Sequence, residues 1–160
     1  MERERLLPVH RGVYAVGHAR LTRDGHRSAA LLAAGDRAAL SHREAAALHA
    51  LLPSAGTRVE LTTPDQRRVR GVNVHRARLE RVDVTTVEGL PVTTVARTLV
   101  DLADVVPRER LRKALEEADR SHRLDVREMK PFWRARAAGT AGAMSASGMR
   151  WPSWRRPGRL

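Results

Sequence analysis

The sequence contains no cysteine among its 160 residues, and only 3% of them are aromatic. The lack of cysteine excludes disulfide frameworks, thiolate catalysis and cysteine-ligated metal sites. No apolar run approaches the roughly 20 residues of a membrane-spanning helix, and the N-terminal residues lead into no signal-like apolar segment. These absences predict a soluble, cytoplasmic protein that has no membrane partner.

Lysine is also scarce, because all but two of the 30 basic residues are arginine. The formal net charge of +12 favours an anionic partner, most often a nucleic acid. The abundance of arginine, alanine, valine and leucine is equally typical of a GC-rich bacterial genome, which weakens that argument. The charge is uneven, since residues 131–160 hold six arginines and no acid, which leaves a net charge of +6 on the first 130 residues.

No catalytic or metal-binding signature stands out. The seven histidines include no i, i+4 pair, and the sequence lacks a nucleophile elbow, a phosphate-cradling glycine loop and a dinucleotide fingerprint. Pro64-Asp65 and Glu128-Met129-Lys130 spell fragments of a metal-dependent nuclease motif. Glu128 and Lys130 fall in a predicted helix, however, where residues two apart point to different sides. We therefore expect no catalytic residue, metal, cofactor or small-molecule ligand.

Hydrophobic periodicity predicts an α+β fold, in which a small, mostly antiparallel sheet is flanked by helices and preceded by a short strand pair. Strands are predicted as a pair within residues 6–17, and at 57–63, 72–76 and 84–92, with a two-residue turn at Glu88-Gly89. Helices are predicted at 22–34, for about ten residues from a Ser41–Glu44 capping box, after Thr93 or Thr94, after Pro107, and from about Asp125.

The least ambiguous stretch runs from residue 90 to residue 103. Its helix carries an apolar stripe at helical spacing, formed by Val95, Leu99, Leu102 and Val106. Arg97 and Asp101 lie four residues apart on a different face. The simplest interpretation is a core helix with a solvated ion pair worth roughly 0.3–0.5 kcal/mol.

Residues 67–81, here called the arginine segment, hold one acid, Glu80, and six arginines: Arg67, Arg68, Arg70, Arg76, Arg78 and Arg81. Together with Asn73 and His75, these side chains could line the solvent face of a sheet and contact phosphates. Such contacts give a salt-sensitive affinity that does not depend on sequence. The alternative is a solvated edge strand whose arginines discourage aggregation.

The C-terminal residues differ in composition from the rest of the chain. All three tryptophans and the single phenylalanine lie in the last 29 residues. One interpretation is a basic, aromatic arm for single-stranded nucleic acid. The interpretation we favour is a disordered tail over residues 129–160 that results from a reading-frame slip.

Four segments resemble the AbiEi-type antitoxin-like proteins of actinobacteria, a type IV toxin–antitoxin family. They are His10 to Gly17, Leu40 to Leu48, Val74 to Leu79 and Gly89 to Ala103. Family members usually combine a winged helix, an α/β middle domain and often a very-short-patch-repair-like endonuclease domain. The resemblance implies that residues 1–17 are the remnant of the wing and residues 18–128 the middle domain. It also implies that the N-terminal helices are truncated and the endonuclease domain is absent.

The resemblance implies a non-enzymatic transcriptional regulator or antitoxin, functionally paired with a nucleotidyltransferase toxin. Weak DNA binding is expected through six residues: Arg11, Arg67, Arg68, Arg70, His75 and Arg76. The most family-like polar residues, Arg97, Thr98 and Asp101, are expected to hold their helix to the preceding hairpin. Two alternatives stay open: an accessory region of a very-short-patch-repair-like endonuclease whose catalytic domain is missing, and a truncated product without function.

Overall fold

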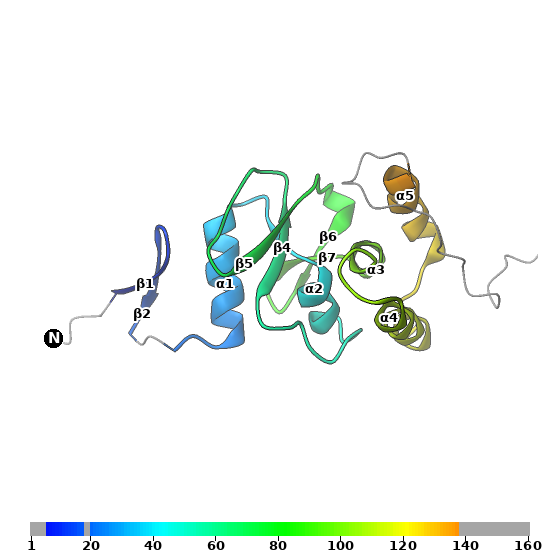
Figure 1. Cartoon of the computed structure of the whole chain (residues 1–160), viewed down its shortest axis with the longest axis horizontal. Coiled ribbons are helices and arrows are strands. Elements are labelled where there is room, and N and C mark those ends of the chain that lie inside the picture. Colours follow the sequence, from blue (N-terminus) through cyan, green and yellow to red (C-terminus); the bar gives the residue numbers. More distant parts are fainter. Residues whose placement is uncertain (1–5, 18–19, 138–160) are drawn as a thin grey trace, which may run out of the picture.

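The computed structural model describes residues 6–17 and 20–137 (Figure 1). In these ranges the chain forms a two-stranded hairpin, a five-stranded sheet, five α-helices and one 3-10 turn. Along the chain these elements are β1 (Leu6–His10), β2 (Val13–Val16), α1 (Arg23–Ala34), β3 (Ala39–Leu40), α2 (His42–Leu48), β4 (Val59–Thr63), β5 (Val72–Arg76), η1 (Arg81–Asp83), β6 (Val84–Val87), β7 (Leu90–Thr93), α3 (Val95–Leu102), α4 (Arg108–Arg120) and α5 (Val126–Ala137). The predicted α+β class is confirmed.

The larger sheet is mixed, with the strand order β5-β4-β3-β7-β6. Two neighbouring pairs are antiparallel (β3–β4 and β6–β7) and two are parallel (β3–β7 and β4–β5). The prediction of a mostly antiparallel sheet is therefore wrong in this respect. One reason is β3, which has only two residues and so carries no alternation signal, yet lies at the centre of the sheet, parallel to β7. The other is that β4 and β5, although both predicted, pair in parallel.

Helices lie on both sides of the sheet, with α1 on one side and α2 to α5 on the other (Figure 1). The α1 side packs small residues of that helix against strand residues, and Ala30, Ala34, Leu40, Leu61 and Val92 are all fully enclosed. These alanines bring the helix close to the sheet, because they have no side chain beyond Cβ. Val59 and Leu61 of β4 both belong to this core, because residues two apart on a strand face the same side of the sheet.

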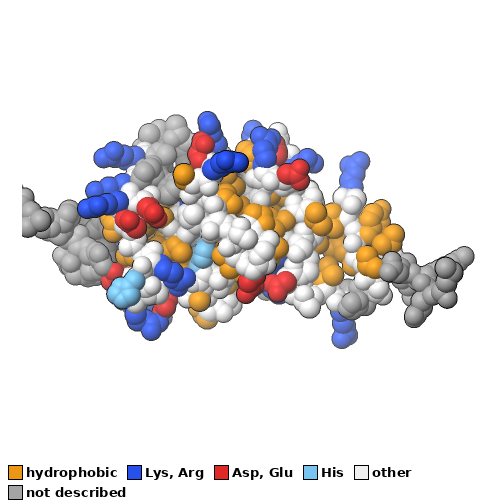
Figure 2. Space-filling view, turned by 180° about the vertical axis from the view of Figure 1, so that it is seen from behind, with side chains coloured by type: hydrophobic (Ala, Val, Ile, Leu, Met, Phe, Trp, Pro, Cys, Tyr) orange, Lys and Arg blue, Asp and Glu red, His pale blue; other side chains and the backbone are white. Residues whose placement is uncertain are grey.

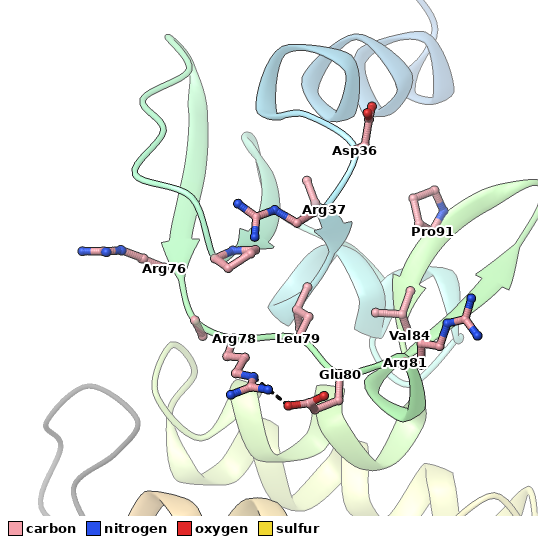
Figure 3. A pocket seen from close by; sticks show the side chains of 12 residues that line it. Asp36, Arg37, Arg76, Arg78, Leu79, Glu80, Arg81, Val84 and Pro91 are labelled. Carbon is pink, nitrogen blue, oxygen red and sulfur yellow. Dashed lines mark ion pairs between the residues drawn. The ribbon is translucent and has the colours of Figure 1, made fainter.

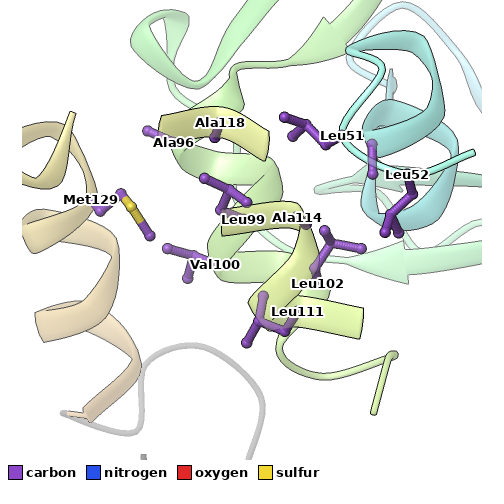
Figure 4. Close-up of a cluster of buried hydrophobic side chains, with 11 residues drawn as sticks. Leu51, Leu52, Ala96, Leu99, Val100, Leu102, Leu111, Ala114, Ala118 and Met129 are labelled. Atoms are coloured by element: carbon purple, nitrogen blue, oxygen red, sulfur yellow. The ribbon is translucent and has the colours of Figure 1, made fainter. Parts of the chain in front are cut away.

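The second core surrounds α3 (Figure 4). Leu99 and Leu102 of the predicted stripe are 1% and 0% exposed. They lie among buried side chains from α4 and α5, including Leu111, Ala114 and Met129. Four helices, α2 to α5, thus share one apolar interior, and burial of each large side chain contributes about 1.5–3 kcal/mol.

Two helices begin as their sequence predicts. The hydroxyl of Thr22 accepts a hydrogen bond from the Gly25 amide at 3.1 Å, and that of Thr94 accepts one from the Arg97 amide at 3.4 Å. The predicted turn between β6 and β7 is confirmed as well, because Glu88 and Gly89 both have positive φ, at 51° and 78°. This conformation is typical of the tight turns that join antiparallel strands.

The start of α2 differs from its prediction. Ser41 makes no side-chain capping bond, because its hydroxyl instead bonds Thr62 Oγ1 at 2.7 Å and His42 Nδ1 at 2.8 Å. The carboxylate of Glu44 accepts hydrogen bonds from Arg23 and Arg27 of α1 instead. The predicted capping box is therefore wrong, since tertiary partners outcompete the local pattern.

The end of the described region also differs from its prediction. Residues 126–137 form α5, so the prediction of disorder from residue 129 is wrong for residues 129–137. Met129 is 5% exposed and packs against α3, and burial of this side chain stabilises α5. The rest of the predicted tail, residues 138–160, lies outside the described residues. None of the helices in the described region combines the length and apolar character needed to cross a membrane.

The hairpin of β1 and β2 packs on α1 and leaves an apolar outer face. Ala15 points inward and is 8% exposed, whereas Leu6, Tyr14 and Val16 are more than half exposed. Figure 2 shows apolar side chains gathered at this end of the molecule. The alternation of strand side chains explains the two faces. The strand pair predicted within residues 6–17 is confirmed.

Candidate nucleic-acid interface

The arginine segment follows one edge of the sheet and then crosses one end of it. Arg67, Arg68 and Arg70 lie in the loop between β4 and β5, and Arg76 ends the edge strand β5. The chain then runs from β5 to η1 and β6 at the opposite edge (Figure 3). All six arginines of the segment are exposed.

Most of these arginines have no acidic partner. Arg78 pairs with Glu80 at 2.7 Å, and both side chains are more than half exposed. The other five arginines form no ion pair with any residue that the structure describes. These five are Arg67, Arg68, Arg70, Arg76 and Arg81. Arg27 and Arg97 differ from these arginines. Their side chains are only 12% exposed, and each forms an ion pair with a carboxylate. The positive charge of the arginine segment is therefore available to an external anion.

His75 does not belong to this exposed surface. Its ring stacks on that of His42, with centroids 3.6 Å apart, and its Nε2 atom is enclosed. Asn73, two residues earlier, points to the same side and donates a hydrogen bond to Glu60 Oε1 at 3.3 Å. Since neighbours along a strand alternate in direction, Arg76 faces the other way. His42, at the start of α2, covers the His75 ring on that face, so His75 and the predicted phosphate contact Arg76 do not form one common surface.

Arg11 is also separated from the arginine segment. It lies at the turn between β1 and β2, next to Gly12 with its φ of 77°. The hairpin is on the far side of α1 from the sheet (Figure 1). The predicted binding arginines thus divide into four at the sheet edge, Arg67, Arg68, Arg70 and Arg76, and one at the hairpin, Arg11.

A hollow of about 960 Å³ opens where β4 and β5 end and β3 begins. It lies between the end of the sheet and the connection from β5 to η1 (Figure 3). Four of the lining residues are arginines and two are acids, so the lining carries a net positive charge. Sequence reasoning missed this feature, because β3 and the crossing connection give no periodic signal.

Arg97 fixes the connection that lines the hollow. Its Nη1 atom lies 3.2 Å from Asp83 Oδ2 and 3.4 Å from the carbonyl oxygen of Arg78, while its Nε atom lies 3.0 Å from Asp101 Oδ1. The side chains of this cluster are only slightly exposed: 12% for Arg97, 4% for Asp83 and 5% for Asp101. The pair predicted as solvated is therefore enclosed, and it joins α3 to residues 78–83.

The other family-like residue, Thr98, joins α3 to the last strand. Its hydroxyl lies 2.7 Å from that of Thr93 and donates to the Thr93 carbonyl at 3.1 Å. Both threonines are fully buried. These contacts attach α3 to the end of β7, the second strand of the β6–β7 hairpin.

Nothing in the described region gathers three or more histidine, aspartate or glutamate side chains in a way that could hold a metal ion. Of the nuclease-like fragments, Asp65 is paired with Arg37, and Glu128 and Lys130 lie on α5. The fragments therefore do not form one carboxylate pair. Comparison with protein-family models and with curated proteins found no match to this chain.

Proposed function

We propose that this protein is a non-enzymatic, DNA-binding regulator of the antitoxin-like class, which contacts the phosphate backbone through its arginine segment. The observation that carries the proposal is the set of five exposed arginines that have no acidic partner in the described region. The resemblance of residues 6–128 to AbiEi-type proteins supports the same class and adds functional pairing with a nucleotidyltransferase toxin. Other exposed arginines, such as Arg108 and Arg110, also form no ion pair with a described residue, so the feature that sets the segment apart is that five such arginines lie within fifteen residues.

The expected binding is electrostatic and weak. Each arginine that neutralises a phosphate releases counterions, so five such contacts give a slope of about −4.5 for log K against log salt. Phosphate contacts position a protein on DNA without reading its sequence. We therefore expect similar affinity for duplexes of unrelated sequence and a steep loss of affinity as salt rises.

The test uses the full chain and a fluorescent duplex, with anisotropy measured between about 50 and 200 mM salt. The test variant combines Arg67→Ala, Arg68→Ala and Arg70→Ala. A matched control combines Arg108→Ala, Arg110→Ala and Arg127→Ala, which removes three exposed arginines of α4 and α5 that form no ion pair within residues 6–17 and 20–137. The test variant should flatten the salt slope by about 3, and the control should not. Equal effects of the two variants, or no binding at low salt, would contradict the proposal.

A further inference from the structure

The hollow at the end of the sheet combines two kinds of surface. Ala77 and Leu79 of the crossing connection supply an apolar part, and four arginines, Arg37, Arg76, Arg78 and Arg81, supply positive charge. Figure 3 places Arg76 on one side of the hollow and Arg81 on the other, with Arg37 between them. A complementary ligand therefore has an anionic group and an adjoining group with an apolar face.

The charges of the hollow are available to such a ligand. Arg76 and Arg81 form no ion pair with any residue that the structure describes. Arg37 and Arg78 pair with Asp65 and Glu80, but their own side chains are 68% and 84% exposed. Exposed ion pairs of this kind are weak, so a phosphate can replace the carboxylate without a large loss.

The size of the hollow limits the ligand further. Its volume of about 960 Å³ is in the range of small-molecule sites and fits one nucleotide unit, with sugar and base. Bases inside a duplex are stacked and cannot offer a face, whereas an unpaired base can stack on a guanidinium plane. None of the residues that line this hollow is aromatic, so a base in it would contact aliphatic side chains and guanidinium planes.

We propose that the hollow binds one unpaired nucleotide, whose phosphate is attracted by the four arginines around the hollow and whose base lies against Ala77 and Leu79. The inference rests on the proposed function only in its choice of a nucleic-acid ligand. The two can be told apart, because the duplex test alters Arg67, Arg68 and Arg70, which do not line the hollow, whereas Ala77→Leu changes the hollow without removing charge.

Arg97 is a positioning residue for this site. It contacts the Arg78 carbonyl and the Asp83 carboxylate, and so holds both ends of the stretch that includes Leu79 and Glu80. The Asp83 carboxylate in turn accepts a hydrogen bond from the Glu80 amide at 2.7 Å. The connection is thus fixed before any ligand binds, which lowers the ordering cost of binding.

The experiment measures binding of three probes to the full chain at low salt: adenosine monophosphate, a short single-stranded oligonucleotide, and the duplex of the same sequence. The variant Arg76→Ala/Arg81→Ala removes charge, and Ala77→Leu narrows the hollow at constant charge. Arg108→Ala/Arg110→Ala on α4 is the control for net charge. Both hollow variants should weaken single-strand binding about tenfold, and the control by much less.

The outcomes separate the sources of the nucleotide. Binding of the monophosphate as well as the oligonucleotide supports a free nucleotide, and binding of the oligonucleotide alone supports a unit within a strand. No binding of either probe would overturn the inference, and so would an Ala77→Leu variant that binds like the parent protein. Amide resonances of residues 76–81 in the unaltered protein should shift on titration, which keeps the test decisive even where the Ala77→Leu variant does not fold.

Discussion

The imidazole ring of His75 on β5 lies flat against that of His42 at the start of α2, with centroids 3.6 Å apart and planes 16° apart. The pair belongs to a polar layer between the sheet and α2. Ser41 bonds His42 on one side and Thr62 on the other. The His75 ring is tolerated in this contact when it is neutral, because a proton on it would add charge to an enclosed site.

We expect this stack to make the protein less stable in acid. Burial lowers the pKa of His75, and the nearby Arg43 guanidinium lowers it further, while the Glu60 carboxylate opposes the change. Burial is also the main cause that lowers the pKa of His49 and of His10. Because the folded pKa lies below the unfolded value of about 6.5, the unfolded chain binds more protons in acid. The free energy of unfolding should therefore be highest above about pH 6.5 and fall as the pH drops below it.

Denaturant unfolding at about pH 7.5 and about pH 5.5 measures this difference. The variant His75→Gln should reduce the loss of stability between the two pH values. His122→Asn, which removes an exposed histidine, is the control and should leave that loss unchanged. A His75→Gln variant with the same pH dependence as the parent would refute the assignment.

Loss of the Arg97 guanidinium should destabilise the fold strongly. Arg97→Ala leaves the carboxylates of Asp83 and Asp101, which are 4% and 5% exposed, without this cation. Removal of one partner from an enclosed ion pair costs about 3–5 kcal/mol. Chemical denaturation provides the measurement. The control is Arg112→Ala on α4, whose ion pairs are exposed and whose loss should change stability little.

The sequence predicts the regular elements because their signals are local. The stripe of α3 and the caps at Thr22 and Thr94 depend on residues within one or two turns, and the structure confirms them. The Arg97–Asp101 spacing was visible for the same reason. The burial of that pair could not be predicted in this way, because it depends on Asp83, which lies fourteen residues before Arg97 and outside the helix.

The candidate site was predictable only in part. The run of arginines is evident in the sequence, but their freedom from carboxylates depends on where every acid lies in the fold. His75 was placed on the wrong face because its partner His42 is 33 positions earlier and belongs to a helix whose packing has no local signal. The hollow depends on β3 and on a connection between opposite edges of the sheet, which only the topology defines.

The carboxylate of Glu44 should stabilise the contact between α1 and α2. It is fully enclosed and accepts hydrogen bonds from Arg23 and from Arg27, the latter at 2.7 Å. Glu44→Gln removes the negative charge between two cations and should destabilise the fold by about 3 kcal/mol or more, as measured by denaturant unfolding. Asp24→Asn is the matched control, because its 63% exposed side chain also pairs with Arg27 but lies at the surface. Similar small effects of both variants would contradict this role of Glu44.

A single alanine at the end of α2 should be replaceable with a gain in stability. Ala50 has a φ of 55°, and it is exposed. Its amide bonds the Ala47 carbonyl at 3.0 Å, and the Leu51 amide bonds that of Ala46 at 2.8 Å, which is the pattern of a Schellman motif.

Glycine is the usual residue at this position of the motif, because a Cβ in the left-handed region costs about 1–2 kcal/mol. The greater freedom of glycine in the unfolded chain offsets part of that gain, so Ala50→Gly should stabilise the protein by about 0.5–1 kcal/mol. Ala47→Gly, inside the same helix, should destabilise it by about 1 kcal/mol. Thermal unfolding of the two variants should therefore shift the midpoint in opposite directions, and a lower midpoint for both would show that the left-handed conformation at Ala50 carries no strain.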